Sequence, residues 1–84
     1  MVFSIYVWNY SPDTPQETIR DFFTVVTTGE PVNITELSFK KDETITKALK
    51  FDYEDEEKIQ LAKLLHGAPL EGTQISVSDQ VVWS

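Results

Sequence analysis

Apolar and polar residues alternate at the start of the chain, where the segment from Val2 to Tyr10 is rich in β-branched and aromatic side chains. This composition and the period of two favour a β-strand. One face of the strand then carries Phe3, Ile5 and Val7. The other face carries Ser4, Tyr6 and Trp8. A purely polar outer face would not carry two large rings, so we expect Tyr6 and Trp8 to serve a function.

A helical period follows the turn Ser11-Pro12-Asp13, and the helix is predicted to start at residues 14–17,. Thr14 can cap the helix, Pro15 suits the first helical position, and Glu17 can complete a capping box. The apolar stripe repeats every three or four residues and consists of Ile19, Phe22, Phe23 and Val26. The helix is predicted to end between Thr27 and Gly29, where the glycine favours a stop.

Two further strands are predicted on either side of a charged turn. The second strand spans residues 32–39, and a shift of its apolar register between Ile34 and Leu37 predicts either a bulge or a strand that starts late,. Residues 40–43 form a charged hairpin loop. The third strand spans residues 44–53, with an inward face of Leu49, Phe51 and Tyr53. Its opposite face carries Thr46, Ala48, Lys50 and Asp52.

A second helix begins where acidic residues gather at positions 54–57, as the positive end of the helix dipole favours,. Asp55 is the expected cap, and Gly67 is expected to end the helix. The buried stripe consists of Ile59, Ala62 and Leu65. A last strand is predicted over residues 73–78, with Ile75 and Val77 facing inward.

The order strand-helix-strand-strand-helix-strand predicts an α+β, ferredoxin-like sandwich. Its four-stranded antiparallel sheet carries both helices on one face, which leaves the face with Tyr6 and Trp8 open. One domain is expected over residues 1–78, followed by a short apolar tail over residues 79–84. Trp83 and its apolar neighbours either fold back over the sheet or begin a linker.

Three segments resemble the RNA-recognition motif (RRM) family. Ile5-Tyr6-Val7-Trp8-Asn9-Tyr10 matches the first-strand signature of that family at all but the last position, where leucine is usual. Phe51-x-Tyr53-x-Asp55-Glu56-Glu57 resembles the entry to its second helix, and Leu70-Glu71-Gly72-Thr73 the approach to its last strand. The resemblance covers residues 3–78 and implies an RNA-binding domain.

The third strand departs from the family pattern. Aligned on Tyr53, residues 46–53 keep the inward apolar positions but place Ala48 and Lys50 where the family has aromatic residues on the sheet face,. In family members these rings stack on bases, and each stack contributes about 1–3 kcal/mol. We therefore expect RNA binding of modest affinity.

Composition narrows the function classes. The 84-residue chain has 14 acidic and 7 basic residues and a formal net charge of −7, the opposite sign from that favoured by binding mainly through phosphates. Without cysteine and with His66 as its one histidine, it offers no thiolate zinc site, cysteine nucleophile or histidine pair. No signal peptide or apolar run of the roughly 18 residues that span a membrane is present, so we expect a nuclear or cytoplasmic protein.

Single-stranded RNA is the expected partner, bound by a monomer. Tyr6 and Trp8 would stack on bases. Lys50 either meets a phosphate or pairs with Asp52. Further phosphate contacts are expected from Lys40, Lys41 and Lys47, although Asp42 and Glu43 offset the first two charges.

The alternative is a degenerate RRM that contacts a protein with a basic or aromatic segment. Its interface would be either the open sheet face with Trp8 or the acidic region at the second helix. The candidate residues are Trp8, Asp52, Glu54, Asp55, Glu56 and Trp83. In either case we expect no catalytic residue, metal site or cofactor.

Overall fold

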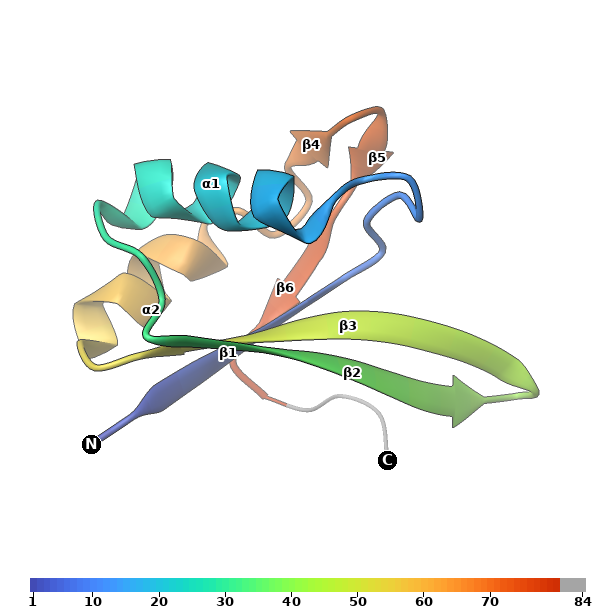
Figure 1. The fold of residues 1–84 in the computed structure, drawn as a ribbon, viewed down its shortest axis with the longest axis horizontal. Helices are drawn as coiled ribbons and strands as arrows, with labels where there is room; N and C mark the ends of the chain where they lie inside the picture. The colour runs from blue at the N-terminus through green and yellow to red at the C-terminus, as the bar shows by residue number, and fades with distance from the viewer. Residues whose placement is uncertain (81–84) are drawn as a thin grey trace.

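The computed structural model describes residues 1–80 and shows two helices packed against one face of a β-sheet (Figure 1). The helices are α1 (Gln16–Thr27) and α2 (Glu56–Lys63). The main sheet consists of β1 (Phe3–Trp8), β2 (Asn33–Lys41), β3 (Thr44–Tyr53) and β6 (Ser76–Ser78). These strands are antiparallel in the order β2-β3-β1-β6, which confirms the predicted α+β, ferredoxin-like fold.

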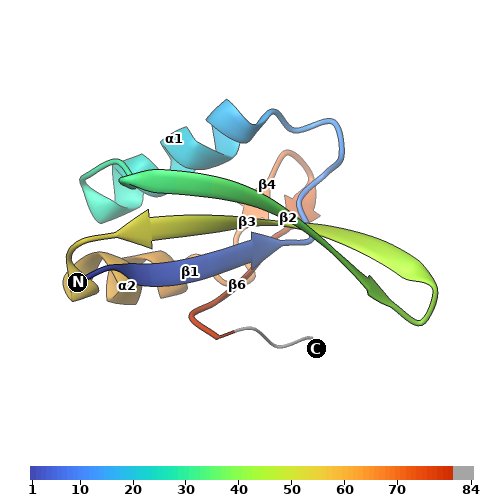
Figure 2. The same cartoon turned by 60° about the horizontal axis from the view of Figure 1, so that its bottom comes forward.

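The β2–β3 hairpin projects beyond the helices (Figures 1 and 2). Its pairing is continuous from Asn33 opposite Asp52 to Lys41 opposite Thr44, so the predicted bulge was wrong. The apolar register shifts because Ile34 faces the helices whereas Leu37 lies on the other side of the sheet, opposite Ala48,.

The turn of this hairpin is shorter than the predicted loop over residues 40–43. Lys40 and Lys41 belong to β2, and the turn itself consists of Asp42 and Glu43. Both turn residues have positive φ, 51° and 65°. This is the backbone geometry of a two-residue type I′ turn, which matches the twist of the two strands.

The predicted last strand over residues 73–78 is interrupted at Ile75. The Ile75 N–H donates to the carbonyl of Ala68 at 3.0 Å, and its carbonyl accepts from the N–H of Gly67 at 2.7 Å. Residues before this break form β5 (Thr73–Gln74), which pairs with β4 (Pro69–Leu70) in a small second sheet. Residues 69–70, which precede the predicted last strand, therefore form a strand of their own.

The start of α1 differs from the prediction at Thr14. Pro15 occupies the cap position and Gln16 is the first helical residue. The Thr14 hydroxyl instead donates to Oε2 of Glu71 at 2.9 Å, so it joins the entry of α1 to the β4–β5 turn. At the other end, Thr28 rather than a glycine adopts the left-handed conformation, with φ of 57°. For α2 the predicted cap is confirmed, because Asp55 accepts from the N–H of Glu57 at 3.0 Å.

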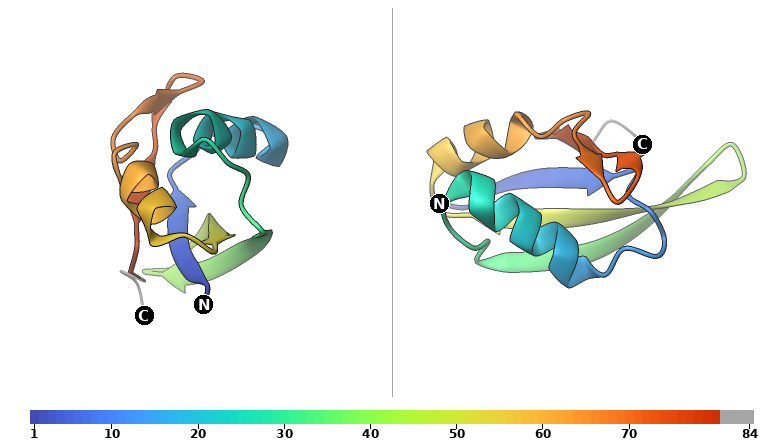
Figure 3. Two further views of the ribbon diagram at one scale, coloured as in Figure 1. Left: turned by 90° about the vertical axis from the view of Figure 1, so that its left-hand side faces the viewer. Right: turned by 90° about the horizontal axis from the view of Figure 1, so that it is seen from above.

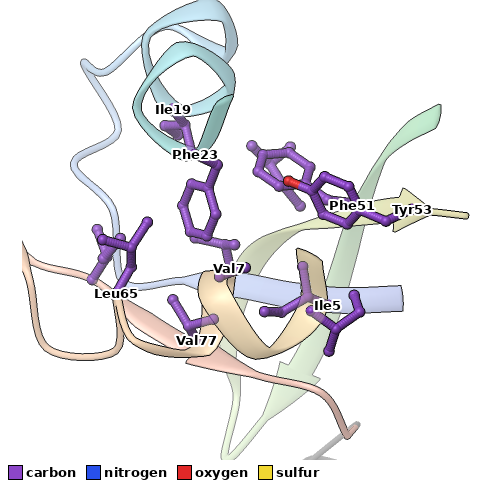
Figure 4. Close-up of a cluster of buried hydrophobic side chains, with 12 residues drawn as sticks. Ile5, Val7, Ile19, Phe23, Phe51, Tyr53, Leu65 and Val77 are labelled. Carbon is purple, nitrogen blue, oxygen red and sulfur yellow. The ribbon is translucent and has the colours of Figure 1, made fainter. Parts of the chain in front are cut away.

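The core lies between the helices and the sheet (Figures 3 and 4). Phe23 of α1 packs edge to face against Phe51 of β3, with ring centroids 5.1 Å apart. The predicted inward residues of β1, β3 and the second helical stripe are confirmed as buried, except Phe3, which is partly buried at the edge of the core. Figure 4 labels Ile5, Val7, Ile19, Phe23, Phe51, Tyr53, Leu65 and Val77 within this cluster.

Candidate functional site

The open face is the side of the main sheet that points away from both helices (Figure 3). Strand register assigns its residues, because directly paired residues project to the same side. Tyr6 of β1 pairs with Lys50 of β3 and with Ser78 of β6. Trp8 lies two residues further along β1 and pairs with Ala48 and Ser76. The structure therefore places Tyr6, Trp8 and Lys50 on one surface, as the period-two pattern predicts.

One part of the open face is apolar and consists of Trp8, Leu37, Phe39 and Ala48. Leu37 pairs with Ala48, so Ala48 has Leu37 on one side and Trp8 on the other. This position explains why the small Ala48 side chain is 0% exposed on a face without helices. Leu37 and Phe39 are site residues that the sequence did not identify, because the register shift in β2 hides their common face. Their separation by one polar residue was the available signal.

The other part of the open face is polar and is organised around Asp52. This carboxylate accepts a hydrogen bond from the Ser4 hydroxyl at 2.7 Å and a longer one from Asn33 Nδ2 at 3.4 Å. The Lys50 ammonium lies 3.8 Å from it. Because Asp52 is only 8% exposed, it serves mainly to hold its neighbours and offers little surface to a partner.

The remaining lysines do not share the open face with Tyr6. Lys40 pairs with Ile45, and Lys47 pairs with Ser38. By alternation these residues lie on the helix side of the projecting hairpin, where both lysine side chains are exposed,. The side chain of Lys41, and Trp83 with the rest of residues 81–84, fall outside the described part of the structure.

The acidic candidates lie at the far end of β3 from Trp8. Glu54, Asp55 and Glu56 are exposed, and Asp55 also caps α2. They follow Tyr53, whereas Trp8 pairs with Ala48, five residues earlier on the same strand. At the rise of a β-strand this corresponds to about 17 Å. The two candidate surfaces for protein contact are therefore separate patches.

Two adjoining clefts lie where β1 ends and the hairpin continues. A cleft of about 190 Å³ runs beneath the start of α1. It is lined by Tyr10, Pro12, Thr14, Gln16, Ile19, Glu36, Lys47 and Leu49. A second cleft, of about 470 Å³, is lined by Asn9, Tyr10, Pro12, Ile45, Thr46 and Lys47. Tyr10, Pro12 and Lys47 border both, so the two form one continuous groove.

The loop after β1 shapes this groove. Asn9 has a positive φ of 65°, and its side-chain amide donates to the Ser76 hydroxyl at 2.7 Å. The chain then turns Tyr10 toward the helix side of the sheet. Burial, and secondarily the Glu36 carboxylate, raise the pKa of the Tyr10 hydroxyl. The hydroxyl, which any tyrosine keeps protonated at neutral pH, therefore remains a hydrogen-bond donor further into the alkaline range.

Other kinds of site find no support in residues 1–80. No group of three or more histidine, cysteine, aspartate or glutamate side chains in this range is arranged to hold a metal ion. None of the helices described is long and apolar enough to cross a membrane. The open face and the groove beside it are the features on which a function can be argued.

Solved structures resemble this fold, although no protein-family model and no curated protein matches the sequence. The third RRM domain of Mip6 has 29% identical residues and a TM-score of 0.69, with 89% of each chain covered. The Rna15 RRM with bound RNA (GU) has 17% identity and a TM-score of 0.68, covering 94% of this chain and 87% of that one.

A third structure contains the first two RRM domains of the yeast poly(U)-binding protein Pub1. It has 16% identity and a TM-score of 0.73, and 96% of this chain matches 47% of that one. The chain thus spans about half the length of this two-domain structure. The order of strands and helices, the aromatic first strand and these likenesses agree, and the chain has the fold of an RNA-recognition motif.

Proposed function

We propose that this domain binds single-stranded RNA with modest affinity on its open face, as a monomer in the nucleus or cytoplasm. The observation that carries the proposal is the row formed by Tyr6 and Lys50, with Trp8 next along β1. Aromatic rings on such a face stack on bases, and a neighbouring cation attracts phosphate. The shared fold with the Rna15 RRM, whose structure contains bound RNA, supports RNA as the partner.

Each residue in this row has a separate role. Tyr6 stacks on one base, and Trp8 with the apolar part of the face extends the platform to the next. Lys50 is held near Asp52, yet its side chain is 35% exposed and can turn to a phosphate. Lys40, Lys41 and Lys47 contact phosphates of RNA that continues past the sheet.

Two features limit the affinity. The positions of Ala48 and Lys50 lack the rings that would supply further stacks of about 1–3 kcal/mol each. The net charge of −7 repels the RNA backbone at long range,. Moderate salt screens that repulsion but also weakens the lysine–phosphate contacts. Affinity therefore depends mainly on the stacked rings.

An amide-shift titration of the ¹⁵N-labelled domain with a random hexanucleotide RNA pool tests this function. We expect the amides of Tyr6, Trp8 and Lys50 to shift together. Tyr6→Ala should weaken binding about tenfold, within the range of one lost stack. Tyr6→Phe is the matched control and should keep most of the affinity because the ring remains. An absence of shifts at low salt would contradict the proposal.

Protein contact is a second candidate function, favoured by the aliphatic character of part of the face. Leu37 and the covered Ala48 offer packing rather than stacking to a partner. The exposed Glu54 and Glu56 form a separate acidic patch for a basic segment. Titration with short peptides that carry tryptophan or arginine separates the two functions. Saturable shifts at Trp8 and Leu37 with such a peptide, but none with RNA, would favour protein contact.

A further inference from the structure

The groove beside the end of β1 joins the two sides of the sheet. The pairing of β1 with β3 ends at Trp8 and Ala48, and β3 continues as far as Thr44 at the tip of the hairpin. Thr46 belongs to the open face because it alternates with Ala48, whereas Ile45 and Lys47 belong to the helix side. All three line the 470 Å³ cleft, which therefore leads from one side to the other.

The chemistry of this cleft suits a nucleotide. Its lining contains one cation, Lys47, and no carboxylate among residues 1–80, although acidic residues outnumber basic ones twofold in the chain. Tyr10 presents a ring and a protonated hydroxyl, and Ile45 is an apolar wall that is 69% exposed. A volume of about 470 Å³ lies in the range of small-molecule sites,.

The cleft is continuous with the surface proposed to bind RNA. Asn9 follows Trp8 directly, and Thr46 lies two residues from Ala48, which is about 7 Å along a strand,. A strand of RNA stacked on Tyr6 and Trp8 thus reaches the mouth of the cleft with its next nucleotide. Lys47 is exposed and lines this cleft, so its ammonium group is available to the phosphate of that nucleotide.

We propose that an RNA strand bound on the open face turns around the end of β1 and places a further nucleotide in the cleft of Asn9, Tyr10, Ile45, Thr46 and Lys47. This proposal rests on the proposed RNA-binding function and adds a site to it. The base packs against Tyr10 and Ile45, and Lys47 binds the phosphate. Glu36, which borders the adjoining smaller cleft, opposes the binding of that phosphate.

Comparing RNA lengths separates this site from the open face. The sheet face of an RRM accommodates two or three bases, so a random dinucleotide pool should occupy the open face without needing the cleft. A random hexanucleotide pool should also shift the amides of Asn9, Tyr10, Thr46 and Lys47. Lys47→Gln should then lower hexanucleotide affinity about two- to fivefold and leave dinucleotide affinity unchanged.

Two further measurements sharpen the test. The slope of log affinity against log salt for the hexanucleotide should fall by about 0.7 in Lys47→Gln, the value for one lost phosphate contact on a single strand. Glu36→Gln should change hexanucleotide affinity in the opposite direction. Lys63→Gln is the matched control, since it removes the same charge from α2 outside both clefts and should leave the slope unchanged.

The outcomes distinguish the site from the function. Hexanucleotide shifts confined to Tyr6, Trp8 and Lys50, with Lys47→Gln behaving as Lys63→Gln, would overturn the cleft and leave RNA binding intact. Cleft shifts with a tryptophan-containing peptide but not with the hexanucleotide would also overturn it. An absence of shifts with either RNA pool would overturn the proposed function itself.

Discussion

Lys58 of α2 donates a hydrogen bond from its ammonium group to the carbonyl oxygen of Thr27, the last residue of α1, over 2.7 Å. The same ammonium lies 3.0 Å from the hydroxyl of Thr28. A cation at this end of a helix interacts favourably with the helix dipole and satisfies a carbonyl that has no partner within the helix. The contact therefore joins the two helices at a defined point.

Replacing Lys58 by methionine should lower the free energy of unfolding by about 1–2 kcal/mol, because the apolar stem remains while the charged hydrogen bond is lost. Urea denaturation measures the change. Lys63→Met is the control: its ion pair with Asp79 is exposed and should contribute at most about 0.5 kcal/mol,. Equal losses in the two variants would show that the bond to Thr27 contributes nothing specific.

Tyr53→Phe should stabilise the domain at neutral pH. The Tyr53 hydroxyl is buried without a hydrogen-bond partner among the described residues, while the nearby Thr27 hydroxyl donates to the carbonyl of Phe23 at 2.9 Å. Removing an unpaired buried hydroxyl should raise the free energy of unfolding by about 1 kcal/mol at pH 7. Urea denaturation provides the measurement, and a loss of similar size would mean that the hydroxyl has a partner in solution.

The same substitution should change the alkaline limb of the stability curve. Burial raises the pKa of Tyr53, and the nearby Thr27 hydroxyl only partly offsets the rise. The folded pKa lies above the unfolded value of about 10, so above that pH the unfolded chain loses the phenol proton before the folded domain does. The free energy of unfolding is therefore unaffected below pH 10 and falls as the pH rises through the folded pKa. Tyr53→Phe should lose less stability between pH 9 and about 11, and Tyr10, whose pKa is also raised, should account for part of the rest.

Lys50→Phe should increase RNA affinity. Lys50 lies beside Tyr6 on the open face at a position where RRM domains carry an aromatic residue. A ring there should add a stack and strengthen binding about five- to a hundredfold. Fluorescence or amide-shift titration with the random hexanucleotide pool provides the affinity. Lys50→Gln removes the charge without adding a ring and should weaken binding, so a gain in both variants would point to a loss of charge as the cause.

Ala48→Phe should have a different outcome, although Ala48 is the other departure from the family pattern. Its side chain is 0% exposed between Trp8 and Leu37, so a ring cannot lie flat on the sheet without displacing them. We expect a loss of about 1–3 kcal/mol in unfolding free energy, measured in urea, and no gain in RNA affinity. A stable variant with tighter binding would show that Trp8 moves readily.

Glu43→Gly should stabilise the hairpin by about 0.5 kcal/mol. Glu43 has φ of 65° at the second turn position, where a side chain is strained and glycine is favoured,. The gain is partial, because glycine also has more freedom in the unfolded chain. The turn of Glu71 and Gly72 already has a glycine at its second position, with φ of 84°. Gly72→Ala should therefore destabilise the domain, and thermal denaturation measures the change in both variants.

The central strands could be predicted from the sequence because alternation decides their faces locally. Phe51 and Tyr53 of β3 and Ile5 of β1 are buried as their period-two pattern requires. β2 could not be predicted in the same way. Its outer half projects past the helices, so Glu36 on the helix side meets solvent while Leu37 turns to the open face, an arrangement that depends on tertiary structure.

The candidate site shows the same division. Tyr6 and Trp8 were placed on one face by spacing and by family resemblance, and the register confirms that placement. Lys47 lies on the helix side, as alternation along β3 requires, but its position in a cleft depends on where β1 ends and where the following loop turns Tyr10,. The break at Ile75 likewise depends on backbone hydrogen bonds to Gly67 and Ala68, which leave no trace in hydrophobic periodicity.

The central position of β1 has a consequence for how the protein is made. Tyr6, near the beginning of the chain, is paired with Lys50 on one side and with Ser78 on the other. As the polypeptide leaves the ribosome, β1 emerges long before either partner strand. One edge of β1 can pair once β3 has been synthesised, but its other edge has no partner until β6 follows. The domain therefore completes its folding only at the end of its synthesis. Its many contacts between residues far apart in the sequence make that step slower than in an all-helical domain.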